Sequence, residues 1–512
     1  MRISILSFQA VIFASMAACG SQNQGGGRQL TTLTGNAQNA PVGLIGEDQE
    51  VSRLRRSIHE SLKDPPKDVD GTPPIPSDFP ALSPRGFASG NMSPFESEFT
   101  YLQAENHDCL KKLLEYSSSS VRAEFETRMA AESSRPALRL LYAAEAAICG
   151  SEKAALEILE SMMSSDYSTV RNALGAIRMS LHERSEEPPG WALDLALAAI
   201  GDDRELTGLE HANFRSAEPV RVSYLADESD HLVWSLGELK YRAAVPLLIE
   251  RLDKSEASRG YIMALQMIGD PRAVPPMIRF LERFLKDKKS RDAASNTDRL
   301  GRLMTALGAF KAKEVVPLLV AHLEYHEAIQ ALERIGDPQV VPALRALVES
   351  RGAIRVDGEK ITWGEDDRWA AARLAVCMLG DNDPIPGLCS QLRDMSLGEF
   401  HRRDVLSRLY ARPDPRSVPV LLQVVKGDPC GYVVSPAIEV LGGLRFPESV
   451  DALIECFNAP FDGKGDWKRA YTPEMFRENI AGSLTRLTSQ KFPADKTRWE
   501  TWWQGNRDSF KK

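Results

Sequence analysis

The chain has 512 residues, in which Asp and Glu outnumber Lys and Arg by 71 to 63, so its formal net charge is −8 at neutral pH. Nothing in this balance suggests a phosphate-binding footprint, and we expect no nucleic-acid partner. The length would ordinarily indicate several domains, but an array of repeats grows by addition and escapes the size limit of a single core. Length alone therefore does not decide the number of domains.

Residues 1–18 have the pattern of an export signal. Arg2 is followed by an apolar run from Ile3 to Met16, which is too short for a membrane span and has the length of a signal-peptide core. The sequence Met16-Ala17-Ala18-Cys19-Gly20 resembles the bacterial lipoprotein lipobox, which implies cleavage before Cys19 and lipid attachment to it. An uncleaved signal or an ordinary secretory signal peptide is the alternative.

The lipobox resemblance also predicts where the protein resides. It implies an extracytoplasmic protein that is attached to the membrane through a lipid anchor, such as palmitate. In a cell with two membranes the resemblance points to the outer one, since Gly20 is not the Asp that marks retention in the inner membrane.

Two segments separate Cys19 from the clearest repeats. Residues 19–95 are rich in Gly, Ser, Gln, Asn and Pro, a composition that cannot build a core and predicts a disordered tether. Within this segment, 47–63 has helical composition. Residues 96–215 are also helical in pattern but lack the phrase that recurs later, and we interpret them as degenerate repeats at the capping end.

The sequence Gly-Asp-Pro recurs with its surroundings, at 267–275 and 334–342, and looser copies surround both. A Leu-Gly or Ile-Gly signal marks each copy, as at Gly237, Gly308 and Gly442. We expect the glycine to end one helix in a left-handed conformation and a proline to open the next, where its missing N–H costs nothing. The unit is therefore two helices and a tight turn, and it must stack on its neighbours to bury its apolar face.

Gly-Asp-Pro-x-x-Val-Pro-x-Leu after an Ala-rich helix resembles the HEAT family, specifically the PBS lyase HEAT-like repeats. The resemblance covers residues 216–490 and implies an all-α fold, an α/α superhelical solenoid of HEAT-like repeats behind a disordered N-terminal tether. The word lyase is a label of the repeat, and a shared fold transfers no activity.

Residues 491–512 form a Trp-rich ending. Trp499, Trp502 and Trp503 lie at positions i, i+3 and i+4, which places them on one helix face. We predict a capping helix that covers the open end of the last repeat. An exposed aromatic face that binds sugar or peptide is the alternative.

Six cysteines remain besides Cys19, in an export context that permits disulfides. Antiparallel helix geometry favours the pairs Cys377-Cys389 and Cys430-Cys456, which leaves Cys109-Cys149. Buried thiols that pack as small apolar residues are the alternative.

His326-Glu327 is the strongest sign of enzymatic chemistry. Deoxyhypusine hydroxylases are HEAT proteins that hold two irons with His-Glu pairs at this point of successive helices, and two irons need many converging ligands. Counting ten residues back from each glycine finds only this pair among six positions: Asp227-Glu228, Arg259-Gly260, Asp298-Arg299, His326-Glu327, Ala370-Ala371 and Tyr432-Val433. His59-Glu60 and His182-Glu183 lie outside these repeats. The sequence has no nucleophile elbow, Cys-x-x-Cys pair or Gly-rich phosphate loop.

The sequence therefore predicts a binding surface and neither a catalytic site nor a cofactor or metal. In HEAT-type solenoids the second helix of each unit lines the concave side. We predict that this protein is a scaffold that binds a protein or peptide of the cell envelope there. A metal-dependent hydroxylase- or lyase-like enzyme using His326 and nearby carboxylates is the first alternative, and a structural spacer in an envelope assembly is the second. The candidate partner-binding residues are Asp227, Asp230, His231, Arg259, Asp298, Arg302, His326, Arg368 and Tyr432.

Overall fold

The computed structural model describes most of the chain, and every regular element in the described part is a helix. Two isolated β-bridges, Asp166 with Thr207 and Glu205 with Arg221, are the only extended pairings there. None of the described helices is both long and apolar enough to cross a membrane. The described residues are 48–68, 71–83, 98–182, 188–207, 220–226, 232–254, 258–286, 294–350, 365–380, 382–459 and 472–510.

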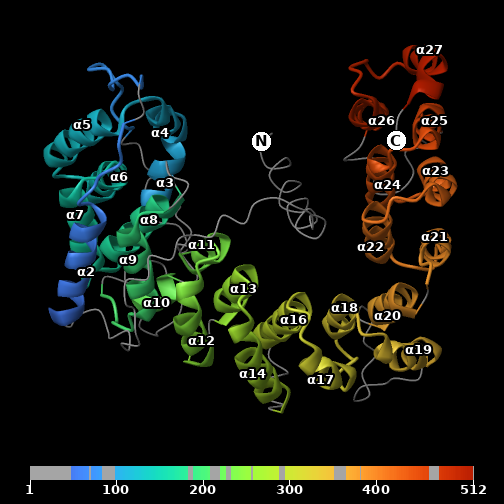
Figure 1. Cartoon of the computed structure of the whole chain (residues 1–512), viewed down its shortest axis with the longest axis horizontal. Helices are drawn as coiled ribbons and strands as arrows, with labels where there is room; N and C mark the ends of the chain where they lie inside the picture. Colours follow the sequence, from blue (N-terminus) through green and yellow to red (C-terminus); the bar gives the residue numbers. More distant parts are fainter. Residues whose placement is uncertain are drawn as a thin grey trace. The chain divides into compact units, whose positions relative to one another are not determined.

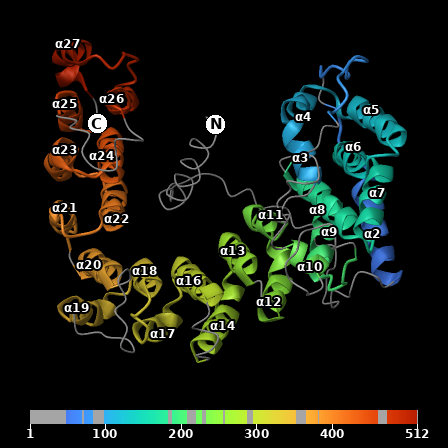
Figure 2. The ribbon, with the colours of Figure 1, turned by 180° about the vertical axis from the view of Figure 1, so that it is seen from behind.

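The helices belong to two compact units, which divide between Ala312 and Lys313. In the N-terminal unit one layer is a continuous stack in which each helix packs on the next (Figures 1 and 2). This second-helix layer comprises α6 (Pro136–Ile148), α8 (Tyr167–His182), α11 (Leu232–Glu238), α13 (Ser258–Ile268) and α16 (Ala294–Ala309). The helices that precede them in each pair are α5 (Ser118–Ala131), α7 (Glu152–Met162), α9 (Gly190–Gly201), α12 (Val245–Lys254) and α14 (Val274–Lys286).

The C-terminal unit repeats the arrangement. Its second-helix layer comprises α18 (His326–Ile335), α20 (Glu365–Gly380), α22 (Glu399–Tyr410), α24 (Gly431–Gly443) and α26 (Pro473–Thr488). The partner helices are α17 (Val316–Val320), α19 (Val341–Glu349), α21 (Ile385–Arg393), α23 (Val418–Gly427) and α25 (Pro447–Cys456). One apolar core runs from Leu374 on α20 to Trp503 near the C-terminus. The predicted all-α solenoid of helix pairs is confirmed.

The aspartate and the proline of the recurring phrase have separate roles at the start of a helix. The Asp270 and Asp337 carboxylates accept hydrogen bonds from the backbone N–H of Arg272 (3.0 Å) and Gln339 (2.9 Å), so each caps a short 3-10 turn. A later proline, which is Pro275 in the first copy, is the second residue of the α-helix that follows the 3-10 turn, where no N–H is needed. This holds for Pro246, Pro275, Pro317, Pro342, Pro386 and Pro419.

The recurring glycines end their helices only in part of the array. Gly269 and Gly336 are left-handed as predicted, with φ of +70° and +78°. The helices that contain Gly237 and Gly308 continue beyond these glycines, so the prediction is wrong there. The left-handed residues are instead Lys240 (φ +52°) and Lys311 (φ +54°), and the next 3-10 turn begins two residues later, as it does after Gly269.

Gly237 and Gly442 serve helix packing. A Cβ atom on Gly237 would lie 2.9 Å from the Cα of Ala264 on α13, and one on Gly442 would lie 2.7 Å from the Cβ of Ser483 on α26. Both distances are shorter than side chains tolerate. These glycines therefore let adjacent helices of the second-helix layer approach closely.

The Trp-rich ending packs on α25 of the last described helix pair. It folds as α27 (Lys496–Asn506), in which Trp499 and Trp503 are buried and join the core of the C-terminal unit. The indole Nε1 of Trp503 donates to Asp451 Oδ1 on α25 at 2.6 Å. Because these rings are buried, the alternative of an exposed aromatic binding face is not supported.

Part of the predicted tether is folded, which corrects its C-terminal boundary. Residues 48–61 form helix α2, which packs on α7 and α9 with Leu54 and Ile58 fully buried. Further on, Phe79 and Leu82 are also buried, and Arg128 donates to the backbone carbonyl of Phe79 at 2.7 Å. A few apolar residues at suitable spacing thus suffice to dock a segment that is otherwise polar. Residues 1–47 lie outside the described part.

The six cysteines carry thiols, so none of the predicted disulfides Cys109-Cys149, Cys377-Cys389 and Cys430-Cys456 is present. The Cys377 thiol donates to the carbonyl of Pro384 (3.3 Å), and the Cys430 thiol donates to Glu399 Oε2 (3.0 Å). Burial raises the pKa of Cys430 to about 11 and that of Cys456 to about 12, which disfavours the thiolate that disulfide formation needs. Four of these thiols are buried and pack as small apolar residues, whereas Cys109 and Cys430 are only partly buried.

Helix α22 is held by two buried polar contacts. Arg402 forms an ion pair with Asp428, and both side chains are almost fully buried. The adjacent residue, His401, donates from Nε2 to Gln391 Oε1 on α21 at 2.9 Å. Burial, with the positive charge of Arg373, lowers the pKa of His401 to about 4, so the ring is neutral at physiological pH.

Replacing Gly442 by Ala should destabilise the C-terminal unit. The new methyl group would clash with the Cα and Cβ of Ser483, and overpacking of this kind costs about 1–3 kcal/mol. Gly482 on α26 is the matched control, because a Cβ there meets nothing within 4 Å and alanine favours a helix by up to about 1 kcal/mol. Urea unfolding of the two variants measures the difference. Equal stabilities would contradict the proposed close approach.

The neutral state of His401 predicts a pH dependence of stability. Its pKa is near 6.5 in the unfolded chain and about 4 in the folded one, so its contribution is complete above pH 6.5 and is lost as the pH falls toward 4. The loss amounts to roughly 3 kcal/mol. We expect His401→Gln to lose less stability than the wild type between pH 7 and pH 4.5 in parallel denaturation curves. Identical pH slopes for the two proteins would show that His401 does not titrate as described.

Candidate functional site: the second-helix face

Three of the predicted partner-binding residues meet in the N-terminal unit. Asp298 on α16 accepts a hydrogen bond from Arg302 Nε at 2.8 Å, and its Oδ2 lies 3.9 Å from Nε of Arg259 on α13. Arg259 and Asp298 are more than half exposed. One carboxylate thus lies between two guanidinium groups, so these three side chains carry a net positive charge. Exposed ion pairs of this type add at most about 1 kcal/mol to stability.

In the C-terminal unit the predicted residues have different environments. His326 is the first residue of α18, and its Nδ1 lies 3.2 Å from Glu327 Oε2. Tyr432 is the second residue of α24 and is largely exposed. Arg368 is buried, and its Nη1 donates to the carbonyl of Glu324 at 3.4 Å. The structure therefore removes Arg368 from the predicted surface and gives it a role in packing.

The remaining predicted site residues lie outside the described part of the chain. These are the lipid-attachment residue Cys19 and the partner-binding candidates Asp227, Asp230 and His231.

Tyr432 belongs to an exposed apolar row. Phe400 on α22, Tyr432 on α24 and Met475 on α26 are 68%, 61% and 45% exposed, respectively. Each lies in the first turn of its helix, and these three helices stack in order. Large apolar side chains that are exposed side by side mark an interaction surface, whereas single ones need no explanation.

Charged side chains follow the apolar row on the same faces of these helices. On α22, Arg403, Asp404 and Arg408 come three, four and eight residues after Phe400. These spacings place all four side chains on one side of the helix. By the same reasoning Glu439 shares a face of α24 with Tyr432, and Arg486 shares a face of α26 with Met475.

Hydrogen bonds between helices of this layer connect these side chains. Arg408 donates to both carboxylate oxygens of Glu333 on α18, at 2.8 and 3.2 Å. Asn479 Nδ2 on α26 donates to Ser435 Oγ on α24 at 3.3 Å. We name this surface the second-helix face and define it by Phe400, Arg403, Asp404, Arg408, Tyr432, Ser435, Glu439, Met475, Asn479 and Arg486.

Two carboxyl groups of the second-helix face have raised pKa values. Burial raises the pKa of Asp404, and the positive charge of Arg408 opposes this shift only in part. Burial likewise raises the pKa of Glu439, against the opposing charge of Arg486. Asp404 nevertheless remains accessible to solvent. A cationic group of a partner that paired with either carboxylate would relieve part of the cost of its desolvation.

The repeat register found in the structure changes the positions at which metal ligands would be sought. If the left-handed residues Lys240 and Lys311 replace the glycines as reference points, counting ten residues back gives Asp230-His231 and Gly301-Arg302. His326-Glu327 is still the only His-Glu pair among these positions. The described residues contain no group of three or more His, Cys, Asp or Glu side chains that could hold a metal ion.

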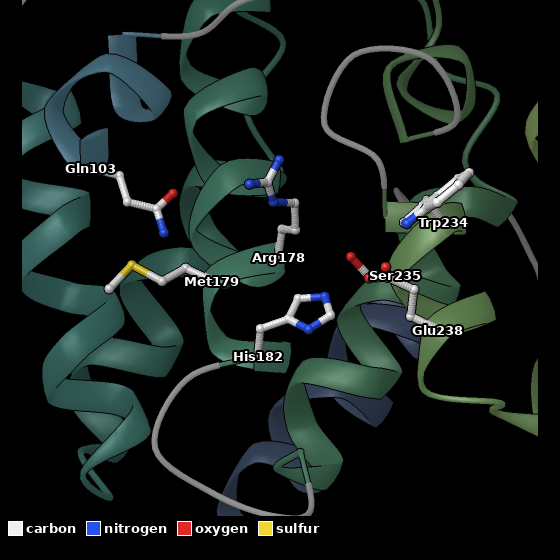
Figure 3. A pocket seen from close by; sticks show the side chains of 7 residues that line it. All are labelled: Gln103, Arg178, Met179, His182, Trp234, Ser235 and Glu238. Atoms are coloured by element: carbon white, nitrogen blue, oxygen red, sulfur yellow. The ribbon is translucent and has the colours of Figure 1, made fainter. Parts of the chain in front are cut away.

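The N-terminal unit contains a pocket that the sequence did not indicate (Figure 3). It has a volume of about 500 Å³ and lies between α3 (Glu98–Glu105), α8 and α11. Helix α3 contributes Gln103 to its wall. The other lining residues come from α8 and α11: Arg178, Met179, His182, Trp234, Ser235 and Glu238. His182 is the first residue of the second His-Glu pair noted in the sequence.

The apolar row could have been recognised from a weak sequence signal. Phe400 and Met475 each follow the start of a second helix by one or two residues, as Tyr432 does. To recognise this pattern, the first residue of each helix must be known to within one residue. No Gly-Asp-Pro phrase marks the first residues of these three helices. The pocket has no sequence signal, because its walls come from helices that are far apart in the chain.

Two stretches of the chain, 231–254 and 324–350, match the family described as PBS lyase HEAT-like repeat. The chain therefore contains HEAT-like repeats in both units. No curated protein sequence matches it.

Two solved structures align with parts of this chain at low similarity. The structure of human deoxyhypusine hydroxylase in complex with glycerol is 16% identical, covers 58% of this chain and 96% of its own, and has a TM-score of 0.21. That of importin β is 13% identical and covers 80% of this chain, with a TM-score of 0.35. The aligned part is 56% of the importin β chain. At these values neither likeness indicates a function.

Proposed function

We propose that this protein is a lipid-anchored, extracytoplasmic HEAT-repeat scaffold that binds a protein or peptide partner on its second-helix face. The observation that carries the binding proposal is the exposed row of Phe400, Tyr432 and Met475 on three stacked second helices. The anchor and the location rest on the resemblance of residues 16–20 to a lipobox. The fold itself suits this role, because stacked helix pairs offer an extended surface.

The spacing of the row limits the shape of the partner. Packed helices lie about 8–10 Å apart, so Phe400 and Met475 are separated by about 20 Å. This distance corresponds to about six residues of extended chain. A short segment with apolar side chains at intervals can therefore contact all three residues.

The charges beside the row favour a partner segment of mixed polarity. Asp404 and Glu439 offer carboxylates, while Arg403 and Arg486 offer guanidinium groups on the same face. Apolar anchors bordered by charges of both signs are typical of protein interfaces, in which the anchors supply affinity and the charges supply specificity. The proposed partner is accordingly a protein segment and not a lipid or a nucleic acid.

Substituting the apolar row should abolish partner binding. We expect Phe400→Ser/Tyr432→Ser/Met475→Ser to weaken binding at least 10-fold, because buried apolar anchors dominate interface energies. Exposed positions tolerate such changes with about 0.5 kcal/mol of stability each. A photoreactive phenylalanine analogue at position 432 in intact cells identifies the partner. The affinity of that partner is then measured for the wild type and the triple variant.

Leu114→Ser provides the matched control, because Leu114 is an exposed apolar residue of the N-terminal unit and is not part of the row. It should leave the affinity unchanged. If position 432 forms no crosslink, or if the triple variant binds the crosslinked partner as tightly as the wild type does, the second-helix face is not the binding site.

The anchor has a separate test. Cys19→Ala should prevent labelling by radioactive palmitate and move the protein from the membrane fraction to the soluble extracytoplasmic fraction, since no other lipid-attachment residue is predicted. Ser21→Ala, two residues further on, should behave as the wild type. A Cys19→Ala protein that is still labelled would rule out Cys19 as the lipid site.

A further inference from the structure

The pocket between α3, α8 and α11 has the dimensions of a small-molecule site. Its volume of about 500 Å³ falls within the range of roughly 300–1,000 Å³ that is usual for such sites. Met179 and Ser235 are buried and contribute its inner wall, whereas Trp234 is 36% exposed at its side. A large indole ring that borders a cavity offers an apolar surface to whatever enters it.

Two opposite charges line the pocket from opposite helices. Arg178 is on α8 and Glu238 is on α11 (Figure 3). Within the described part of the chain neither side chain has an ion-pair or hydrogen-bond partner. Other arginines of the unit are paired: Arg139 binds Glu157 at 2.6 Å, and Arg204 binds Asp202 at 2.8 Å.

The lining therefore combines one available cation, one available anion and an apolar wall. A guanidinium group binds a carboxylate through two parallel hydrogen bonds, and a carboxylate binds an ammonium group. Gln103 and Ser235 add neutral hydrogen-bonding groups that suit a peptide amide. A molecule with a carboxylate, an ammonium group and an apolar body satisfies all three features at once.

We propose that this pocket binds a small zwitterion with an apolar body, namely a hydrophobic amino acid or a short hydrophobic peptide. The carboxylate of the ligand pairs with Arg178, its ammonium group pairs with Glu238, and its side chains pack on Trp234 and Met179. This site is independent of the second-helix face, since it lies in the other unit and uses none of the same residues.

Isothermal titration calorimetry of the purified full chain with leucine, Leu-Leu and Leu-Leu-Leu tests the proposal. At least one of these ligands should bind, and the series identifies the length that suits the pocket. Blocking either end of that ligand, by acetylating the amine or amidating the carboxylate, should weaken its binding at least 10-fold. No detectable binding of any of the three, or equal affinity for the free and blocked forms, would overturn the proposal.

Two variants locate the contacts. Arg178→Gln should lower the affinity for the free ligand at least 10-fold and remove the discrimination against the amidated form. Glu238→Gln should do the same for the acetylated form. Lys153→Gln and Glu115→Gln, which change exposed charges elsewhere in the unit, should have no effect. Variants that retain full affinity and discrimination would place the ligand outside this pocket. The blocked ligands decide the question on the unmodified protein if a variant does not fold.

Discussion

Each helix pair of this chain has an apolar face that only the next pair can cover, and the close contact between consecutive second helices makes that cover tight. At Gly442 the backbone of α24 approaches α26 so closely that no side chain fits between them. Gly237 does the same between α11 and α13. The stack depends on these contacts, because a wider spacing would leave the apolar core of each unit only partly shielded from water.

The same packing decides which side chains remain outside. Val405, Val433 and Ile480 are fully buried and hold α22, α24 and α26 against the core. The opposite stripe of each helix must then face solvent, and folding alone would favour polar residues there. Phe400 and Tyr432 occupy that stripe nonetheless. Their exposure contributes nothing to folding, and the proposed binding surface rests on this exposure.

The fold was largely predictable because a few residues determine each turn. The Asp-Pro dipeptides at 270–271 and 337–338 predict a 3-10 turn that is capped by the Asp side chain. The three C-terminal Trp residues predict a terminal helix. In the copies at Gly237 and Gly308 the left-handed residue lies three residues after the glycine that was expected to adopt this conformation. A glycine that permits a close approach of two helices looks the same in sequence as one that ends a helix. Only the contacts of its neighbours distinguish the two.

The surface was less predictable, since exposure depends on the packing of the whole unit. Tyr432 lies at a position counted from a glycine and is exposed, but Arg368, chosen only as a residue of a second helix, is buried. The few apolar residues that dock 48–68 and 71–83 are not evident in the sequence, because the segment around them is polar in composition. The pocket could not be foreseen at all, because it forms only where α3, α8 and α11 converge.

The docking of α2 has a consequence for the order in which the N-terminal unit folds. Most helices of the array contact their neighbours in sequence, so they can assemble as the chain emerges. Helix α2 is different: its Ser57 bonds Asp194, 137 residues further along the chain. Leu54 and Ile58 thus stay uncovered until α9 has formed. Of the helices that the structure describes, α2 leaves the ribosome first and is among the last to reach its packed position. A chain truncated before residue 190 would never bury it fully.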